Sequence, residues 1–285
     1  MRILNENSDF PQQVALILGF FDGVHAGHYD VIKNTPDTKK VIATFSSSPA
    51  EYFKKDFCYI YPREYNYEIL EKSGVDYIYE QDFTQIAELS ADEYLKKLIK
   101  IFNPKSITTG FNHTFGAKRQ GNSKFLKEYK KDFIYYCTNP TIIDNEIVSS
   151  TRIKNLIISG EIEKANLLLQ RPFSIKSTVV EGNKLGRKLG FPTANLEYPP
   201  NIVKLPYGVY KVKVLNQIAV MNWGTKPTIG AKEVLEIHIP DFNDNLYNKT
   251  LEVEIFSKIR EEKKFNNLEE LKQQIEKDIE VCLKL

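Results

Sequence analysis

Two histidines lie three residues apart in the segment GFFDGVHAGH, which runs from Gly19 to His28. If a helix begins here, one turn brings both imidazoles to the same side. Imidazole donors beside the free N–H groups of a helix start form a site for an anion such as a triphosphate. Such donors also stabilise charge on a reacting phosphorus and on departing pyrophosphate, without a covalent nucleophile. His25 and His28 are therefore predicted to bind phosphate and to act in catalysis; the alternative is two loop histidines without a ligand.

A second glycine-rich string, GNKLGRKLGFPTAN, covers residues 182–195. Its three glycines allow backbone amides to approach phosphates, and its basic side chains add positive charge. The hydroxyl and amide oxygens near its end are hard ligands that suit Mg²⁺. The alternative is a basic, glycine-rich hairpin loop. The predicted ATP ligands are Gly182, Lys184, Gly186, Arg187, Gly190, Thr193 and Asn195, and the last two are also the predicted metal ligands.

The first half of the chain alternates short apolar runs with helical patterns. Such alternation predicts a parallel sheet covered by helices on both faces, with ligands bound beyond the carboxyl ends of the strands. Gly19 and Gly110 each close one apolar run, so the segments that follow them are expected to meet in one crevice. Ser90 and Glu93 predict a capping box. The apolar runs are 14–19, 39–45 and 105–110, and the helical patterns are 67–74 and 90–102.

The second half has a different character. Short β-rich runs separated by Gly, Pro and Asn continue to residue 256 and predict a small antiparallel barrel. Before it, residues 149–172 predict two short helices separated by Ser159-Gly160. Two domains are therefore expected, 1–170 and 171–285. A last helix is expected to pack on the barrel through Leu268, Leu271, Ile275, Ile279 and Leu283.

The composition narrows the classes of function. The chain has 285 residues, of which 42% are hydrophobic, enough for two domains with cores. Its 39 basic and 37 acidic residues leave a net charge of +2, which is not typical of a nucleic-acid binder. Three scattered cysteines indicate a reducing compartment, and no apolar run reaches the roughly 20 residues of a membrane span. We expect a cytoplasmic protein without nucleic-acid or membrane partners, a monomer or weak homo-oligomer.

The first segment resembles the signature of the HxGH nucleotidylyltransferases, in the longer version found in prokaryotic FAD synthetases. Residues 149–154, SSTRIK, resemble the second phosphate-binding element of that superfamily, and 110–116, GFNHTFG, resemble its flavin- and nucleotide-contacting segment. Hydroxyls and cations at a helix start suit a triphosphate, although a simple helix cap is the alternative. The resemblance implies ATP contacts at Gly19, Phe20, Asp22, Gly23, His25, His28, Ser149, Ser150, Thr151 and Arg152, and flavin or nucleotide contacts at Asn112 and Phe115.

The string at 182–195 resembles the GxxxGRxxGxPTAN signature of riboflavin kinases. Residues 222–228 and 235–238 resemble the NxGxxPT and ExH segments of the same family, and the run from Arg260 resembles RxExKF. The resemblance implies that Glu236 is the general base, which typically contributes ~10² to 10⁴ in rate, and that Asn222 and Arg260 contact flavin. The alternative for Glu236 and His238 is the solvent face of a strand.

Together these motifs resemble the prokaryotic bifunctional riboflavin kinase/FMN adenylyltransferases. The resemblance implies a Rossmann-like N-terminal domain of α/β class and a C-terminal β-barrel with a terminal helix. It also implies riboflavin, FMN, FAD and ATP as ligands, with Mg²⁺ or a similar divalent cation. Ser48, His113 and Lys154 stand where the family tends to have histidine, an aromatic residue and arginine. The alternatives are therefore a riboflavin kinase with a weakened adenylyltransferase domain, or a non-catalytic flavin-binding regulatory protein.

Overall fold

The structure of the chain is a computed structural model. It describes residues 1–284 except 54–56, 130–132, 183–185, 187–188, 227–231 and 243. The described chain forms two compact units, the first of residues 1–59 and 63–150 and the second of residues 60–62 and 151–285. Each unit has its own sheet and its own core.

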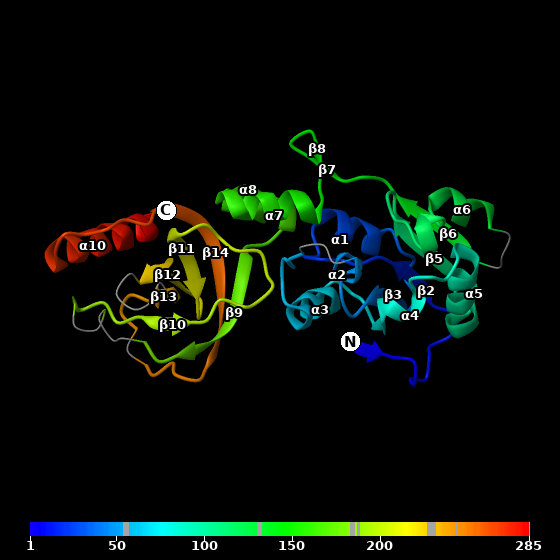
Figure 1. The fold of residues 1–285 in the computed structure, drawn as a ribbon, viewed down its shortest axis with the longest axis horizontal. Coiled ribbons are helices and arrows are strands. Elements are labelled where there is room, and N and C mark those ends of the chain that lie inside the picture. The colour runs from blue at the N-terminus through cyan, green and yellow to red at the C-terminus, as the bar shows by residue number, and fades with distance from the viewer. Residues whose placement is uncertain are drawn as a thin grey trace. The chain divides into compact units, whose positions relative to one another are not determined.

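The first unit is built on a six-stranded sheet in the order β1-β4-β3-β2-β5-β6, in which every neighbouring pair is parallel (Figure 1). Parallel strands must be covered on both faces, and all four residues of β2 are buried accordingly. The strands are β1 (Arg2–Leu4), β2 (Ala15–Leu18), β3 (Lys40–Phe45), β4 (Tyr77–Gln81), β5 (Ser106–Gly110) and β6 (Ile134–Thr138).

Helices of the first unit connect these strands. The longest, α5, begins with the predicted capping box, in which the Glu93 N–H donates to the Ser90 hydroxyl and the Ser90 N–H donates to the Glu93 carboxylate. A two-stranded hairpin, β7 (Ile142–Ile143) with β8 (Glu146–Ile147), follows β6. The helices are α1 (Ala26–Lys33), α2 (Pro49–Tyr52), α3 (Arg63–Lys72), α4 (Phe83–Ile86), α5 (Ala91–Phe102), the 3₁₀ helix η1 (Ala117–Arg119) and α6 (Ser123–Glu128).

The strand order places a switch point beside β2. The chain runs from β2 to β3 and β4 on one side, and returns on the other side with β5. Leu18 of β2 pairs with Thr109 of β5, so Gly19 and Gly110 follow at the same level of two neighbouring strands. Ligands of open α/β sheets bind at such a point, and both predicted segments begin there.

The second unit contains a closed barrel in the order β10-β13-β12-β11-β14-β9, antiparallel throughout. Before it come the two predicted helices, α7 (Ser150–Ser159), whose first residue belongs to the first unit, and α8 (Ile162–Leu169). Gly160 separates them with a φ of +80°. The strands are β9 (Phe173–Val180), β10 (Ala194–Leu196), β11 (Gly208–Val214), β12 (Gln217–Lys226), β13 (Lys232–His238) and β14 (Thr250–Glu261).

The last helix, α10 (Leu268–Lys284), packs on the barrel as expected, and Ile279 of the expected apolar stripe contacts the barrel there. Leu268 and Leu283 are 57% and 60% exposed, so the prediction was wrong for both ends of the expected apolar stripe. The buried side chains are Asp278 and Cys282, and Cys282 packs with residues of β11 and β12. Leu271, Ile275 and Ile279 are half-buried, so the middle of the expected stripe lies on the contacting face together with these two residues.

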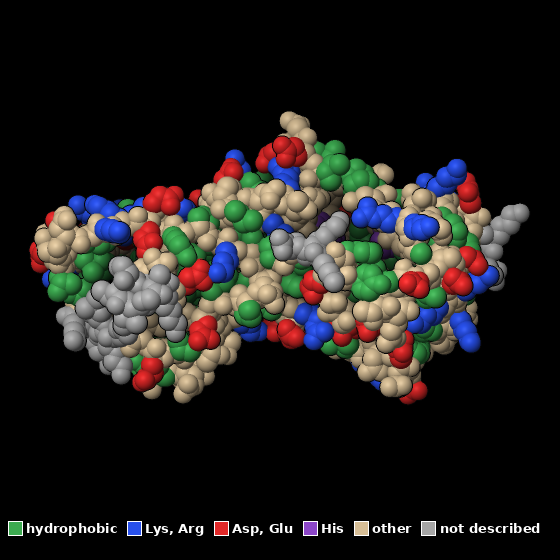
Figure 2. All heavy atoms as spheres, viewed as in Figure 1, with side chains coloured by type: hydrophobic (Ala, Val, Ile, Leu, Met, Phe, Trp, Pro, Cys, Tyr) green, Lys and Arg blue, Asp and Glu red, His purple; other side chains and the backbone are tan. Residues whose placement is uncertain are grey.

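No helix among the described residues is long and apolar enough to cross a membrane. On the face shown in Figure 2, basic and acidic side chains are interspersed, in keeping with the net charge of +2.

Candidate functional sites

The two histidines of the first segment lie against each other. His25 occupies the cap position of α1, and His28 lies in its first turn. Their rings stack with centroids 3.7 Å apart and planes 15° apart, and His25 is only 5% exposed. The three-residue spacing therefore gives the arrangement expected from the sequence, with both imidazoles at one helix start.

The loop before His25 has an uncommon backbone conformation. Phe21, Gly23 and Val24 have φ values of +57°, +85° and +42°. Positive φ is readily adopted by glycine, but for the β-branched Val24 it is an outlier that the surrounding structure must stabilise. Phe21 and Val24 are both buried, so their packing is one source of that stabilisation.

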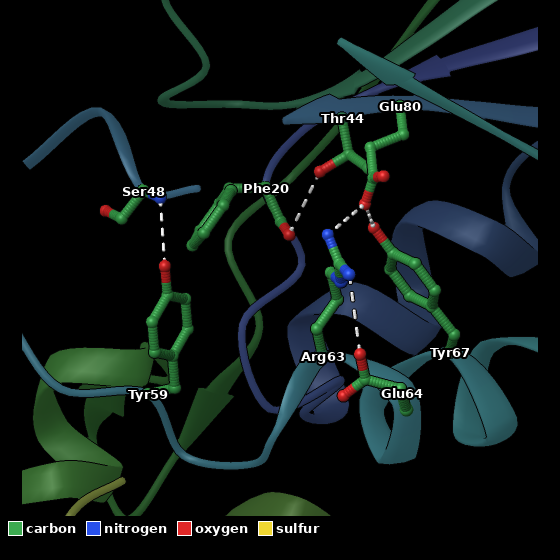
Figure 3. A network of polar contacts seen from close by, with 8 residues as sticks. All are labelled: Phe20, Thr44, Ser48, Tyr59, Arg63, Glu64, Tyr67 and Glu80. Atoms are coloured by element: carbon green, nitrogen blue, oxygen red, sulfur yellow. Dashed lines mark hydrogen bonds and ion pairs between the residues drawn. The ribbon is translucent and has the colours of Figure 1, made fainter. Parts of the chain in front are cut away.

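Successive carbonyl groups of this loop accept hydrogen bonds from three different elements. The Thr44 hydroxyl of β3 makes a long bond of 3.4 Å to the Phe20 carbonyl (Figure 3). Nδ2 of Asn66, in α3, donates to the Phe21 carbonyl at 2.9 Å. Each carbonyl thus has a fixed direction, which a loop without such donors would lack. The third bond, from Ser150, is described below with its helix.

Gly19 is explained by the ring of Phe21. A Cβ at position 19 would lie 2.6 Å from Cε2 of Phe21, a distance that real Cβ atoms do not tolerate. The Phe21 ring also contacts the His28 imidazole, with centroids 4.8 Å apart. Glycine at 19 therefore allows the Phe21 ring to lie against His28.

Ser48, which stands where the family tends to have a histidine, is buried and has a structural use. Its hydroxyl accepts from the Ala50 N–H and so caps α2, and its own N–H donates to the Tyr59 hydroxyl at 3.0 Å (Figure 3). The Tyr59 hydroxyl donates in turn to Glu51. Burial and the Glu51 carboxylate raise the pKa of Tyr59 to about 12, so this phenol remains a neutral hydrogen-bonding group.

The segment after β5 divides into exposed and buried residues. Asn112 is exposed, and its Oδ1 would lie 3.7 Å from a Cβ at Gly110. Phe115 is only 7% exposed and belongs to the core of the first unit. The His113 ring is nearly parallel to Phe115, with centroids 5.9 Å apart, and burial lowers its pKa to about 4. The structure thus places Asn112 where a ligand could reach it and gives Phe115 a packing role.

The second predicted phosphate-binding element starts α7. Ser149 precedes the helix and Ser150 begins it, and the Ser150 hydroxyl donates to the Asp22 carbonyl at 2.8 Å. Thr151 and Arg152 follow within the first turn, where N–H groups and the helix dipole favour anions. Ser150 therefore joins the two segments that the sequence associates with ATP phosphates. Lys154 follows in the same helix, in the position where the family tends to have arginine.

In the barrel, strand register aligns four residues of the predicted kinase site. Asn195 of β10 pairs with Glu236 of β13, and Glu236 pairs with Asn222 of β12. Asn222 pairs with Val209 of β11, and Val209 pairs with Arg260 of β14. Directly opposed residues share a face of the sheet, and their Cβ atoms lie about 4.5 to 5.5 Å apart. We call these five residues the outer row.

The outer row lies on the outside of the barrel. Leu235 and Ile237, on either side of Glu236, are 0% and 1% exposed and fill the interior, whereas Glu236 is half-buried. Since successive side chains of a strand point to opposite faces, Glu236 and His238 both point outward. The alternative considered from sequence, an outer strand face, is therefore correct as geometry. On this outer face, however, Glu236 lies beside Asn195 and Asn222, which are also predicted to bind the substrates or the metal.

The glycine-rich string approaches the outer row at Asn195. A Cβ at Gly182 would overlap the Asn195 side-chain amide, so only glycine allows this approach. Gly186 accepts a hydrogen bond from the Phe191 N–H at 2.8 Å. Thr193 precedes Asn195 by two residues, and Gly190 has a φ of +90°. The predicted nucleotide ligands Lys184 and Arg187 lie outside the described residues.

His238 holds the end of this string. Its Nδ1 is 2.9 Å from the Pro192 carbonyl, and its ring meets Phe191 edge to face at 5.5 Å. A neutral imidazole with the proton on Nδ1 donates this bond. His238, two residues from Glu236, thus connects the strand of the predicted base to the segment of the predicted metal ligands. The sequence did not indicate this role.

Arg260, at the far end of the outer row, is paired with the terminal helix. Its Nε and Nη2 donate to the Asp278 carboxylate at 3.0 and 2.7 Å, and Nη1 donates to the Glu261 carbonyl. The Asp278 side chain is 5% exposed. The structure thus gives Arg260 a role in helix docking, and its predicted contact with flavin stays a prediction.

Comparisons with known proteins agree with both sites. A family profile described as FAD synthetase matches residues 7–152, and one described as riboflavin kinase matches residues 169–285. The bifunctional riboflavin kinase/FMN adenylyltransferase of Haemophilus influenzae is 36% identical over 289 residues, which cover 95% of this chain and 94% of the relative. The protein of the same description from Bacillus subtilis is 33% identical, with 92% and 89% covered.

The chain belongs to the bifunctional riboflavin kinase/FMN adenylyltransferase family. A solved structure from Streptococcus pneumoniae, described as a macrolide-efflux protein, has a TM-score of 0.92, 30% sequence identity and 99% coverage of both chains. That likeness supports the two-part fold. The family profiles and the relatives of this family support the chemistry assigned to each part.

Proposed function

We propose that the chain converts riboflavin to FAD in two ATP-dependent steps, one in each unit. The observation that carries the proposal is that each unit assembles the motif residues of one step. His25 and His28 stack at the switch point of the first unit, and Asn195, Glu236 and Asn222 align on the barrel of the second. We assign residues 1–170 to adenylyl transfer and 171–285 to phosphorylation, in keeping with the family profiles at 7–152 and 169–285.

In the kinase step, the terminal hydroxyl of the riboflavin ribityl chain attacks the γ-phosphorus of ATP, and ADP leaves. Glu236 accepts the hydroxyl proton, and Asn222, its neighbour in the outer row, contacts the flavin. The oxygens of Thr193 and Asn195 are neutral, which suits Mg²⁺ that is held mainly by nucleotide phosphates and water. Bound there, the cation would neutralise phosphate charge, and Gly182 leaves the space that Asn195 requires.

In the adenylyl-transfer step, a phosphate oxygen of FMN attacks the α-phosphorus of ATP, and pyrophosphate leaves with the electron pair of the broken bond. His25, His28 and the start of α7 supply hydrogen-bond donors to the phosphates. Direct attack by FMN requires no covalent nucleophile from the residues of this step. Alignment of the two phosphates and stabilisation of charge are therefore their contribution to the rate.

Ser48 supports one second candidate, a riboflavin kinase with weakened adenylyl transfer. Its hydroxyl caps α2 and cannot carry the positive charge of a histidine. We also infer a cytoplasmic enzyme, monomeric or weakly self-associating, without nucleic-acid or membrane partners. The nearly balanced charge of the sequence supports the absence of nucleic-acid partners, and its three scattered cysteines support a reducing compartment.

The test is chromatography of flavins after incubation of the protein with ATP, Mg²⁺ and either riboflavin or FMN. FAD from both substrates is expected. Glu236→Gln should lower FMN formation ~10²- to 10⁴-fold and leave FAD formation from FMN intact, while His28→Ala should do the reverse. Accumulation of FMN alone in the wild type would favour the kinase-only candidate. No product from either substrate would favour a non-catalytic flavin-binding protein.

A further inference from the structure

The Asn66 side chain makes hydrogen bonds to the loop before His25 on both sides of Asp22. Its Nδ2 donates to the Phe21 carbonyl at 2.9 Å, and its Oδ1 accepts from the Gly23 N–H at 3.0 Å. These two groups belong to the peptide bonds before and after Asp22. One side chain thus fixes both peptide planes that flank Asp22, a task that requires a donor and an acceptor in one amide.

The environment of Asn66 makes these bonds consequential. The residue lies in α3, is 7% exposed, and its neighbours in sequence, Tyr65 and Tyr67, are also buried. A buried amide is costly unless both of its ends are bonded, so its presence in this helix face calls for a role. The loop it holds contains positive φ angles at Phe21, Gly23 and Val24, a conformation that the surrounding structure must impose.

Asn66 is also connected to the second phosphate-binding element. The Asp22 carbonyl, which belongs to the same peptide group as the Gly23 N–H, accepts from the Ser150 hydroxyl at 2.8 Å. Three residues after Asp22, the chain reaches His25 at the cap position of α1. The position of Asp22 therefore affects the contact to Ser150 as well as the direction in which the chain enters α1.

We propose that Asn66 is a positioning residue for adenylyl transfer. It does not contact the substrates itself; it holds the backbone around Asp22 so that His25 and the start of α7 meet the triphosphate together. The inference rests on the proposed function of the first unit and adds a residue outside both of its signature motifs. Its effect is expected on alignment, and so on kcat more than on KM.

Asn66→Leu tests the proposal, because leucine has a similar size but no hydrogen-bonding group. The kcat for FAD formation from FMN should fall ~10- to 100-fold, as expected for misplaced catalytic groups. The KM for FMN should change by less than about threefold, because flavin contacts remain. Phosphorylation of riboflavin by the same molecules should be unchanged, which shows that the second unit is folded, while the retained KM for FMN shows that the first unit is folded.

Ile69→Val is the matched control, a mild change at a buried position of the same helix. It should lower the melting temperature without a selective loss of FAD formation. The proposal is overturned if Asn66→Leu keeps the wild-type kcat, or if Ile69→Val lowers that kcat as much. Absence of FAD with wild-type protein would instead overturn the proposed adenylyl transfer, and this inference with it.

Asn66→Asp covers the case in which Asn66→Leu does not fold. Aspartate keeps an acceptor for the Gly23 N–H and, when ionised, places a negative oxygen against the Phe21 carbonyl in place of the donor, so a decrease in kcat is expected. Wild-type kcat in a folded Asn66→Asp protein would show that the bond to Phe21 is not used for positioning and would overturn the proposal.

Discussion

At the scale of single residues, the two units use polar side chains differently. Asn66 and Ser150 bond to backbone groups and so shape a loop, whereas Asn195, Glu236 and Asn222 stand side by side on a rigid barrel. Sites on strands keep their geometry by register, while sites on loops need supporting hydrogen bonds. The adenylyl-transfer site is therefore expected to be more sensitive to changes outside its motifs.

His238 provides a residue-scale prediction for the kinase. His238→Ala removes the contact to the Pro192 carbonyl and should lower kcat for FMN formation ~10-fold by loosening the segment that carries Thr193. FAD formation from FMN should not change. Initial rates from riboflavin and from FMN measure both effects, and equal losses of the two activities would show a general defect in folding.

His113 provides a prediction of pH dependence. Burial lowers its pKa to about 4 from 6.5, so between these values the unfolded chain binds a proton that the folded chain does not. The contribution of His113 to the free energy of unfolding is therefore fully present above pH 6.5. It is lost as the pH falls toward 4, by at most roughly 3 kcal/mol. His113→Phe should weaken this dependence. Urea unfolding of the wild type and of His113→Phe at pH 7 and pH 5 tests this prediction. The same change in the free energy of unfolding between the two pH values in both proteins would contradict it.

At the scale of elements, sequence patterns predicted the strands and helices well but not the contacts between them. The break at Gly160, the capping box of α5 and the barrel strands other than β10 follow from local residue types. The loop conformation around Asp22 could not be predicted, because a distant residue, Asn66, imposes it. For α10, the pattern predicted the middle of the contacting face, but not the exposure of Leu268 and Leu283 or the ion pair of Asp278 with Arg260.

That ion pair gives a prediction for α10. Asp278→Ala leaves the Arg260 guanidinium without its carboxylate, and breaking a buried pair typically costs about 3 to 5 kcal/mol. Glu280→Ala, which removes an exposed pair with Lys284, should change stability by less than about 1 kcal/mol. Thermal unfolding of both variants makes the comparison. Similar melting temperatures would show that α10 is held by apolar contacts alone.

At the scale of the whole molecule, each unit has a separate core and a separate set of motif residues. The family profiles follow the same division, with one profile on each side of residues 153–168. Sequence alone indicated this organisation, because the change from alternating helices and strands to short β runs is visible in composition. Each activity should therefore survive the loss of the other.

Complementation tests this independence. A mixture of Glu236→Gln and His28→Ala proteins should form FAD from riboflavin, because FMN made by the second protein is a substrate for the first. A lag that shortens as protein concentration rises is expected. FAD formation by the wild type but not by the mixture would show that FMN does not pass through solution.

The closed barrel has a consequence for how this chain can change in evolution. In β13, Leu235 and Ile237 point inward while Glu236 points outward, and each is matched to partners on both sides. Insertion or deletion of one residue in such a strand exchanges its two faces, which would bury the carboxylate and expose the apolar residues. A change of two residues preserves the faces. An odd change in strand length must therefore be absorbed in a loop or in an irregularity of the pairing, such as the register shifts between β11 and β14.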